Sequence, residues 1–113
     1  MLSGALGNMV MNQVQKMQED IGRIEKELDR ERIEVSSGGG MVTVTITGMG
    51  DILEIKLDPA VVDPGDVQML EDLVVTAVRE ALRKAQEEHD HRLSGVMPTL
   101  PPGLNLSRLL GGR

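Results

Sequence analysis

The sequence predicts an α+β fold, an α-β-β-β-α protomer in which a long helix, a three-stranded antiparallel sheet and a second long helix follow one another. Three observations predict it: a seven-residue apolar repeat near the start, alternating β-branched residues in the middle, and a broad apolar stripe later in the chain. We place a single domain at residues 1–93 and a tail rich in proline and glycine at 94–113. Because a chain of 113 residues buries only a modest core, we expect a homodimer.

The first predicted helix carries apolar residues at alternating spacings of four and three, the pattern of a coiled-coil seam. It follows Ser3 and Gly4 and gives way to a β-alternating stretch at about Ile33. At ~1.5 Å per residue, about 25 helical residues extend ~37 Å, longer than a core of this size would cover, so we expect the helix to project. The seam residues, which we expect to contact a partner helix, are Val10, Val14, Met17, Ile21, Ile24 and Leu28.

The next segment contains three stretches that alternate apolar and polar residues, as half-buried strands do. Glycine-rich turns separate them, which predicts an antiparallel meander. A three-stranded sheet has open edges, so we expect two copies to associate through sheet edges, with Val42, Val44 and Ile46 in the interface. The predicted elements are a strand from Ile33, a turn at 36–40, a strand at 41–47, a turn at 48–51, and a strand of Leu53, Ile55 and Leu57 that ends at Asp58 and Pro59.

The second long helix is predicted to start at 63–66, where Asp-Pro-Gly-Asp supplies a start signal and acidic groups suited to the helix dipole. It runs to about Leu93. Its apolar stripe is wider than a coiled-coil seam, which is typical of a helix that packs on a sheet, and its small residues permit close approach. The stripe comprises Val67, Leu70, Leu73, Val74, Ala77, Val78, Ala81, Leu82 and Ala85.

Composition excludes several classes of protein. The absence of cysteine removes disulfides and thiolate metal sites. The absence of Phe, Tyr and Trp removes the side chains on which single-stranded nucleic acids stack. No apolar run approaches the ~20 residues of a membrane span and no secretory signal is visible, so we expect a cytoplasmic protein without a membrane partner.

Metal, cofactor and catalytic sites are not expected either. On a helix, His89 and His91 would point ~200° apart and could not share an ion, which favours a solvated helix end. The glycines at 38–40 precede a strand, whereas a phosphate-binding loop opens a helix, so a hairpin turn explains them. Few nucleophiles remain, and we predict a protein that is not an enzyme and takes no cofactor, metal or small-molecule substrate.

Basic residues form three clusters in a chain whose net charge is −6, and the smallest of them is Arg108 with Arg113 in the tail. Lys16, Arg23 and Arg30 repeat every seven residues and Lys26 falls between them, on the face opposite the seam. They form either an outward stripe available to a partner or a solvated face held by pairs such as Glu19 with Arg23. The second cluster comprises Arg79, Arg83 and Lys84 on the predicted second helix.

Five short motifs lie along the chain in an order and spacing that are specific when taken together. They are Gln13 with Met17 and Gln18, the turn at 37–42 leading to Val44 and Gly48, the Leu-Asp-Pro at 57–59, the segment 69–74 with Ala77 and Ala81 beyond, and the Leu-Pro-Pro-Gly-Leu at 100–104. Across residues 9–104 the chain thereby resembles the YbaB/EbfC family of bacterial nucleoid-associated DNA-binding proteins.

The resemblance implies a homodimer of α-β-β-β-α protomers whose projecting helices grip or bridge duplex DNA. Leu53 and Glu54 stand where relatives often carry basic residues, so contacts through the third strand are not expected. On the second helix, Arg79 stands where an Asn is common. We expect phosphate contacts with little sequence preference. The candidate residues are Lys16, Arg23, Lys26, Arg30, Arg79, Arg83 and Lys84.

Two function hypotheses remain open. The first is a nucleoid-associated homodimer that packages or bridges duplex DNA in the cytoplasm and affects expression through its occupancy. The second is an acidic protein–protein adaptor that engages a DNA-handling or regulatory partner through its acidic surface and helix seam. Charge reversal at Arg23 and Arg30 would abolish DNA retention under the first hypothesis and leave the partner interaction intact under the second.

Overall fold

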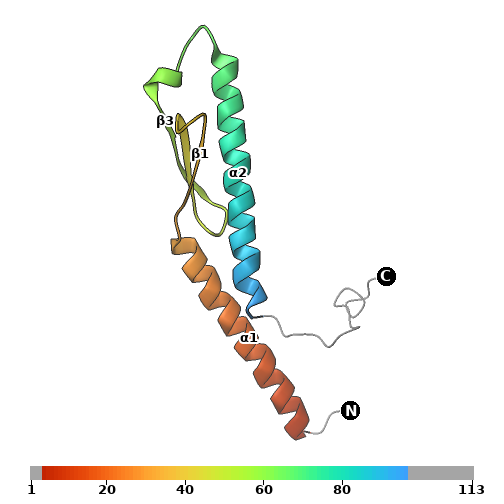
Figure 1. The fold of residues 1–113 in the computed structure, drawn as a ribbon. Helices are drawn as coiled ribbons and strands as arrows, with labels where there is room; N and C mark the ends of the chain where they lie inside the picture. Colours follow the sequence, from red (N-terminus) through yellow and green to blue (C-terminus); the bar gives the residue numbers. More distant parts are fainter. Residues whose placement is uncertain (1–3, 97–113) are drawn as a thin grey trace, which may run out of the picture.

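Two long helices and a three-stranded sheet follow one another in the order that the sequence predicts, as Figure 1 shows. The computed structural model describes residues 4–96, so most of the predicted tail lies outside the described residues. The elements are α1 (Gly4–Arg30), β1 (Ile33–Ser37), β2 (Val42–Ile46), β3 (Ile52–Leu57), the short 3-10 helix η1 (Pro59–Val61) and α2 (Val67–Ser94).

The sheet is antiparallel in the order β1-β2-β3, and α2 packs across β1 and β2. Val44 pairs with Val35 on one side and with Ile55 on the other, so the apolar residues of neighbouring strands share a face. Because alanines line the buried side of α2, the helix approaches that face closely. The core comprises Val35, Val42, Val44, Ile46, Ala77, Ala81 and Ala85.

The third strand departs from the simple alternation that the sequence predicts. Thr45 pairs with Glu54 while the next residue, Ile46, pairs with Ile52, so Leu53 is an additional residue in β3. Such a bulge interrupts the period of two. The strand that the sequence predicts is confirmed, with this one irregularity near its start.

Side chains and glycines fix the connections around the sheet. The turn at 38–40 uses three glycines with positive φ angles of 61°, 68° and 93°, as expected for a hairpin. Ser37 Oγ before the turn donates to the carbonyl of Leu73 on α2 at 2.7 Å. At the start of α2, Asp66 Oδ1 accepts a hydrogen bond from the backbone N–H of Met69 at 3.2 Å, which confirms the predicted start signal.

The turn between β2 and β3 holds the end of α1. The backbone N–H of Gly48 donates to the carbonyl of Leu28 at 2.9 Å. A Cβ on Gly48 would lie 2.7 Å from Leu28 Cδ2, so only glycine permits this approach. The buried Thr47 orders the turn, since its Oγ1 accepts from the backbone N–H groups of Met49 and Asp51.

Helix α1 projects from the body of the protein, as the sequence predicts. Its 27 residues extend about 40 Å, and the structure measures 73 × 32 × 19 Å along its principal axes. In Figure 1 the N-terminal half of α1 (red) runs away from the sheet, at the end of the molecule opposite η1 and the start of α2. Among residues 4–96, neither long helix has the apolar length that crossing a bilayer requires.

Candidate nucleic-acid interface

The basic residues of α1 lie on its outward face. Lys16, Arg23, Lys26 and Arg30 are all exposed, whereas Ile24 and Leu28 are buried on the opposite side. A helix separates residues seven apart by about two turns, so the stripe follows the helix axis from Lys16 on the projecting half to Arg30 at the end of α1. The four side chains are exposed, and their role in binding a partner stays a prediction.

Two of the seven candidate cations are held by carboxylates of their own helix. The two terminal nitrogens of Arg23 lie 3.5 Å from Asp20 and Glu27. Glu27, and not the expected Glu19, is thus its partner at i, i+4. These contacts are long and exposed, so they stabilise the helix only slightly.

The second held cation is Arg83 on α2. Its Nε donates to Glu80 at 2.9 Å, and its guanidinium also pairs with Glu87. The hydrogen bond from Arg83 lowers the pKa of the Glu80 carboxyl below 4.5, and the same bond raises the pKa of Arg83. A phosphate that approaches Arg83 must compete with these carboxylates.

The other five candidates form no ion pair with the residues at 4–96. Lys16, Lys26 and Arg30 belong to the α1 stripe, and Arg79 is exposed on α2. Lys84 lies in a groove between α2 and the start of β1, together with Ile33 and two glutamates. The structure therefore brings the α1 candidates together on one stripe and separates Lys84 from them.

Arg92, which sequence reasoning missed, bridges the two long helices. Its guanidinium faces Glu88 of its own helix at 2.9 Å, Glu27 of α1 at 3.8 Å, and Glu31 just beyond α1. The spacing of Glu88 and Arg92 is visible in the sequence as an i, i+4 pair. The contact with α1 depends on how the helices cross and has no signal in the sequence.

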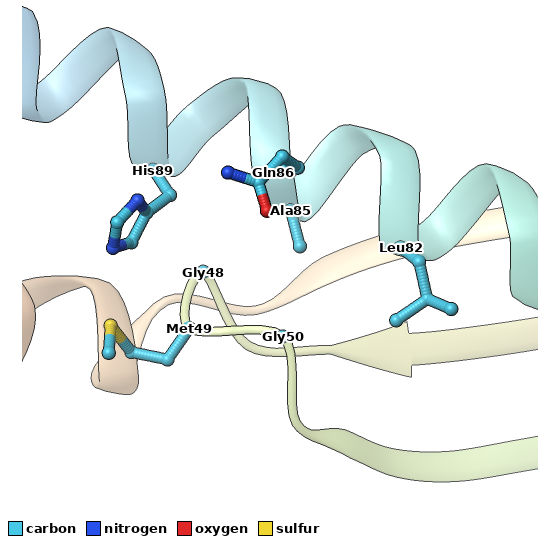
Figure 2. A pocket seen from close by; sticks show the side chains of 7 residues that line it. All are labelled: Gly48, Met49, Gly50, Leu82, Ala85, Gln86 and His89. Carbon is cyan, nitrogen blue, oxygen red and sulfur yellow. The ribbon is translucent and has the colours of Figure 1, made fainter. Parts of the chain in front are cut away.

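His89 lies at the same junction. Figure 2 shows its ring beside the turn of Gly48 and Met49, on the same side of α2 as Ala85 and Gln86. Its side chain is 29% exposed, so the interpretation of both histidines as a solvated helix end is wrong for His89, while His91 is exposed. Among the described residues, no cluster of His, Asp and Glu could hold a metal ion.

The apolar seam of α1 divides into two halves. Ile24 and Leu28 are 8% and 0% exposed because they pack within the same chain, whereas Val10 and Val14 are 46% and 42% exposed. Met17 and Ile21 are intermediate. The first half of the seam therefore has apolar surface available for a second copy.

The predicted interface residues of β2 lie inside the protomer. Val42, Val44 and Ile46 are fully buried beneath α2. The exposed apolar residues of the sheet lie instead on β3, where Ile55 and Leu57 are 42% and 40% exposed. In the described part of the chain β3 pairs only with β2, which leaves its outer edge open. The role of the β2 residues in a dimer stays a prediction.

Comparisons with known proteins converge on one family. The model of the YbaB/EbfC DNA-binding family matches residues 4–100. A protein of Acetivibrio thermocellus named nucleoid-associated protein is 55% identical over 103 residues, which cover 89% of this chain and 90% of the relative. A nucleoid-associated protein of Clostridium acetobutylicum is 42% identical over 108 residues, covering 96% of this chain and 93% of the relative.

A solved structure shares the fold. The crystal structure of an uncharacterized protein from Helicobacter pylori superimposes with a TM-score of 0.72 at 17% sequence identity. The match covers 87% of this chain and 100% of that chain.

Proposed function

The chain belongs to the YbaB/EbfC DNA-binding family, and we propose that it binds duplex DNA as a homodimer with little sequence preference, packaging or bridging DNA. It is a nucleoid-associated DNA-binding protein and not an enzyme, as the family and the names of its relatives indicate. We place it at the nucleoid, in the cytoplasm. Any effect on expression follows from where it occupies DNA.

The observation that carries the proposal is the exposed basic stripe on the projecting helix. Lys16, Lys26 and Arg30 face outward, and no ion pair with another described residue occupies them. Cations of this kind release counterions when they neutralise phosphates, which supplies affinity without reading bases. Because the chain has no aromatic residue, direct base contacts would depend on Arg, Asn and Gln.

The distribution of charge supports an approach of DNA from the side of α1. Residues 4–18 carry Lys16 and no carboxylate, whereas residues 58–72 carry five carboxylates and no basic residue. These two segments lie at opposite ends of the molecule (Figure 1). An acidic protein with a field this uneven can still attract a polyanion at its basic end.

A second copy would complete the binding surface. The exposed first half of the seam, with Val10 and Val14, and β3, with Ile55 and Leu57, are two apolar surfaces that one copy leaves exposed. Association through them removes the open strand edge and doubles the basic stripe, so that modest contacts of each copy add up.

The test is binding to a labelled duplex of about 30 base pairs, followed by fluorescence anisotropy across a salt series. We expect affinity to fall as salt rises. The slope of log affinity against log salt should be negative, with a magnitude of about 0.9 for each phosphate contact, and this magnitude is called the salt slope. A flat salt dependence, or no binding at low salt, would contradict the proposal and favour the adaptor hypothesis.

Matched charge variants locate the residues that bind phosphate. We expect Lys26→Gln and Arg30→Gln to lower the salt slope, by about 0.9 for each phosphate that is no longer neutralised. Arg23→Gln should lower it less, because Asp20 and Glu27 already occupy that guanidinium. The control is Lys56→Gln on β3, which removes the same charge at a strand where no DNA contact is expected. Equal effects of all four changes would show that net charge alone matters.

A further inference from the structure

We propose that Arg92 is a positioning residue that fixes the direction of α1 relative to the sheet and α2. The part of this inference that concerns DNA rests on the proposed function, because Arg92 would control the placement of Lys16 on the projecting half of α1. The part that concerns the direction of the helix stands on the geometry of the junction alone.

Arg92 is the one cation at the crossing of the two helices that contacts carboxylates from both sides of it in the described chain. Its side chain is 33% exposed, and those of Glu31 and Glu88 are 30% and 35% exposed. Ion pairs screened from water to this degree are less weakened by solvent than the more exposed pairs of Arg23.

The other attachments of α1 lie close to the same point. Ile24 and Leu28 are its buried residues, and Gly48 holds the carbonyl of Leu28. From Leu28 to Lys16 the helix extends about 18 Å. A change of about 10° at the junction would therefore move Lys16 by about 3 Å, enough to break a contact with a phosphate.

The balance of charge at the junction gives the direction of the expected change. One guanidinium faces three carboxylates, of which Glu27 and Glu31 come from the α1 side and Glu88 from α2. Without the cation, like charges face each other across the crossing, and they repel. Loss of Arg92 should therefore open the angle between the helices rather than close it.

The test is a distance measurement between spin labels, which the absence of cysteine makes straightforward. Labels at Asn12→Cys on α1 and Val75→Cys on α2 report the direction of α1, and dilution with unlabelled protein restricts the measurement to one chain. We expect a narrow distribution for the parent protein and a longer, broader one for Arg92→Ala. An unchanged distribution would overturn the proposal.

Two further variants separate positioning from loss of structure. Arg83→Ala removes an arginine of the same helix whose partners, Glu80 and Glu87, both belong to α2, and it should leave the distance unchanged. Glu27→Gln with Glu31→Gln removes the α1 partners, so the distance distribution should broaden, but without the carboxylate repulsion that lengthens the distance in Arg92→Ala. If Arg83→Ala shifts the distance equally, Arg92 has no special role.

The same pair of glutamine substitutions gives a readout on DNA. It makes each chain more positive by two charges, so electrostatics alone predicts tighter binding and an undiminished salt slope. Displacement of the α1 cations predicts the opposite, a smaller slope. A larger slope would overturn the role in DNA binding. The spin-label distances are measured without DNA. They therefore test the direction of α1 independently of whether the protein binds DNA.

Discussion

At the scale of single residues, Gly48 is the described glycine at which an added Cβ would meet the closest neighbour. An added Cβ would meet Leu28 Cδ2 at 2.7 Å and the Leu28 carbonyl oxygen at 2.9 Å, and the backbone atom cannot move aside without moving α1. We expect Gly48→Ala to lower the free energy of unfolding by about 1–3 kcal/mol. Thermal unfolding measures it.

The matched control for this substitution is Gly22→Ala in the interior of α1. A Cβ at Gly22 meets nothing within 4 Å, and alanine favours the helix over glycine. We expect this change to raise the free energy of unfolding by about 0.5–1 kcal/mol. Equal effects at both glycines would contradict the close contact between Gly48 and Leu28.

The pair of Glu80 and Arg83 predicts a pH dependence. Arg83 lowers the pKa of Glu80 in the folded chain below 4.5. The stabilisation is therefore fully present above the ordinary pKa of a glutamate and is lost as pH falls through the lowered value. An NMR titration of the Glu80 carboxyl should give a pKa below 4.5, and Arg83→Gln should raise it. A pKa of Glu80 that Arg83→Gln leaves unchanged would contradict the pairing.

At the scale of elements, the two halves of the α1 seam should respond differently to truncation. Leu28→Ala leaves a cavity in a fully buried site and should cost about 2–5 kcal/mol of the free energy of unfolding. Val10→Ala removes a side chain that is 46% exposed and should change that free energy little at low protein concentration. Denaturant unfolding compares the two.

The same pair of variants tests the proposed dimer. If a second copy covers the first half of the seam, Val10→Ala weakens self-association in sedimentation equilibrium while the fold of each copy is kept. If Val10→Ala leaves self-association unchanged, the interface does not include the first half of the α1 seam, and the edge of β3 becomes the favoured interface.

The sequence predicted the elements well and their exposure less well. The repeat of four and three along α1 is uniform in the sequence, yet only Ile24 and Leu28 are buried, because the body of the protein reaches only the end of the helix. The bulge at Leu53 is a feature of the pairing between β2 and β3, so the sequence of β3 alone could not predict it. Local periodicity reports which residues share a face, and the packing of elements decides which part of that face is covered.

At the scale of the whole molecule, charge is separated along the long axis. The five carboxylates of residues 58–72 lie at the end opposite the N-terminus of α1 (Figure 1). Since the Debye length is about 10 Å at 0.1 M salt, they act only weakly on a duplex bound at α1. Each end of the molecule therefore presents its own field.

This separation predicts the effect of neutralising the acidic end. Glu71→Gln with Asp72→Asn should change DNA affinity little at about 0.1 M salt, because screening confines the field of these carboxylates to their own end of the molecule. The same number of charges changed on α1, as Lys26→Gln with Arg30→Gln, should weaken binding strongly. Anisotropy titrations measure both, and comparable effects would show that DNA does not favour the α1 side.

The sequence by itself determined the order of the elements, the limits of both long helices, the hairpin at 38–40 and the outward position of the α1 cations. These follow from the periodicity of side chains, from capping residues and from glycine, all of which act within a few residues. The family was also readable from motifs that lie in order along the chain.

Only the tertiary structure decided which of those side chains are buried and which contact another element. It joined Arg92 of α2 to Glu27 and Glu31 on the α1 side, whereas the partners of Arg23 and Arg83 lie three and four residues away on their own helices. It also buried Ile24 and Leu28 while leaving Val10 exposed. Such choices depend on how distant segments cross, and crossing is set by the packing of whole surfaces, which no local pattern encodes.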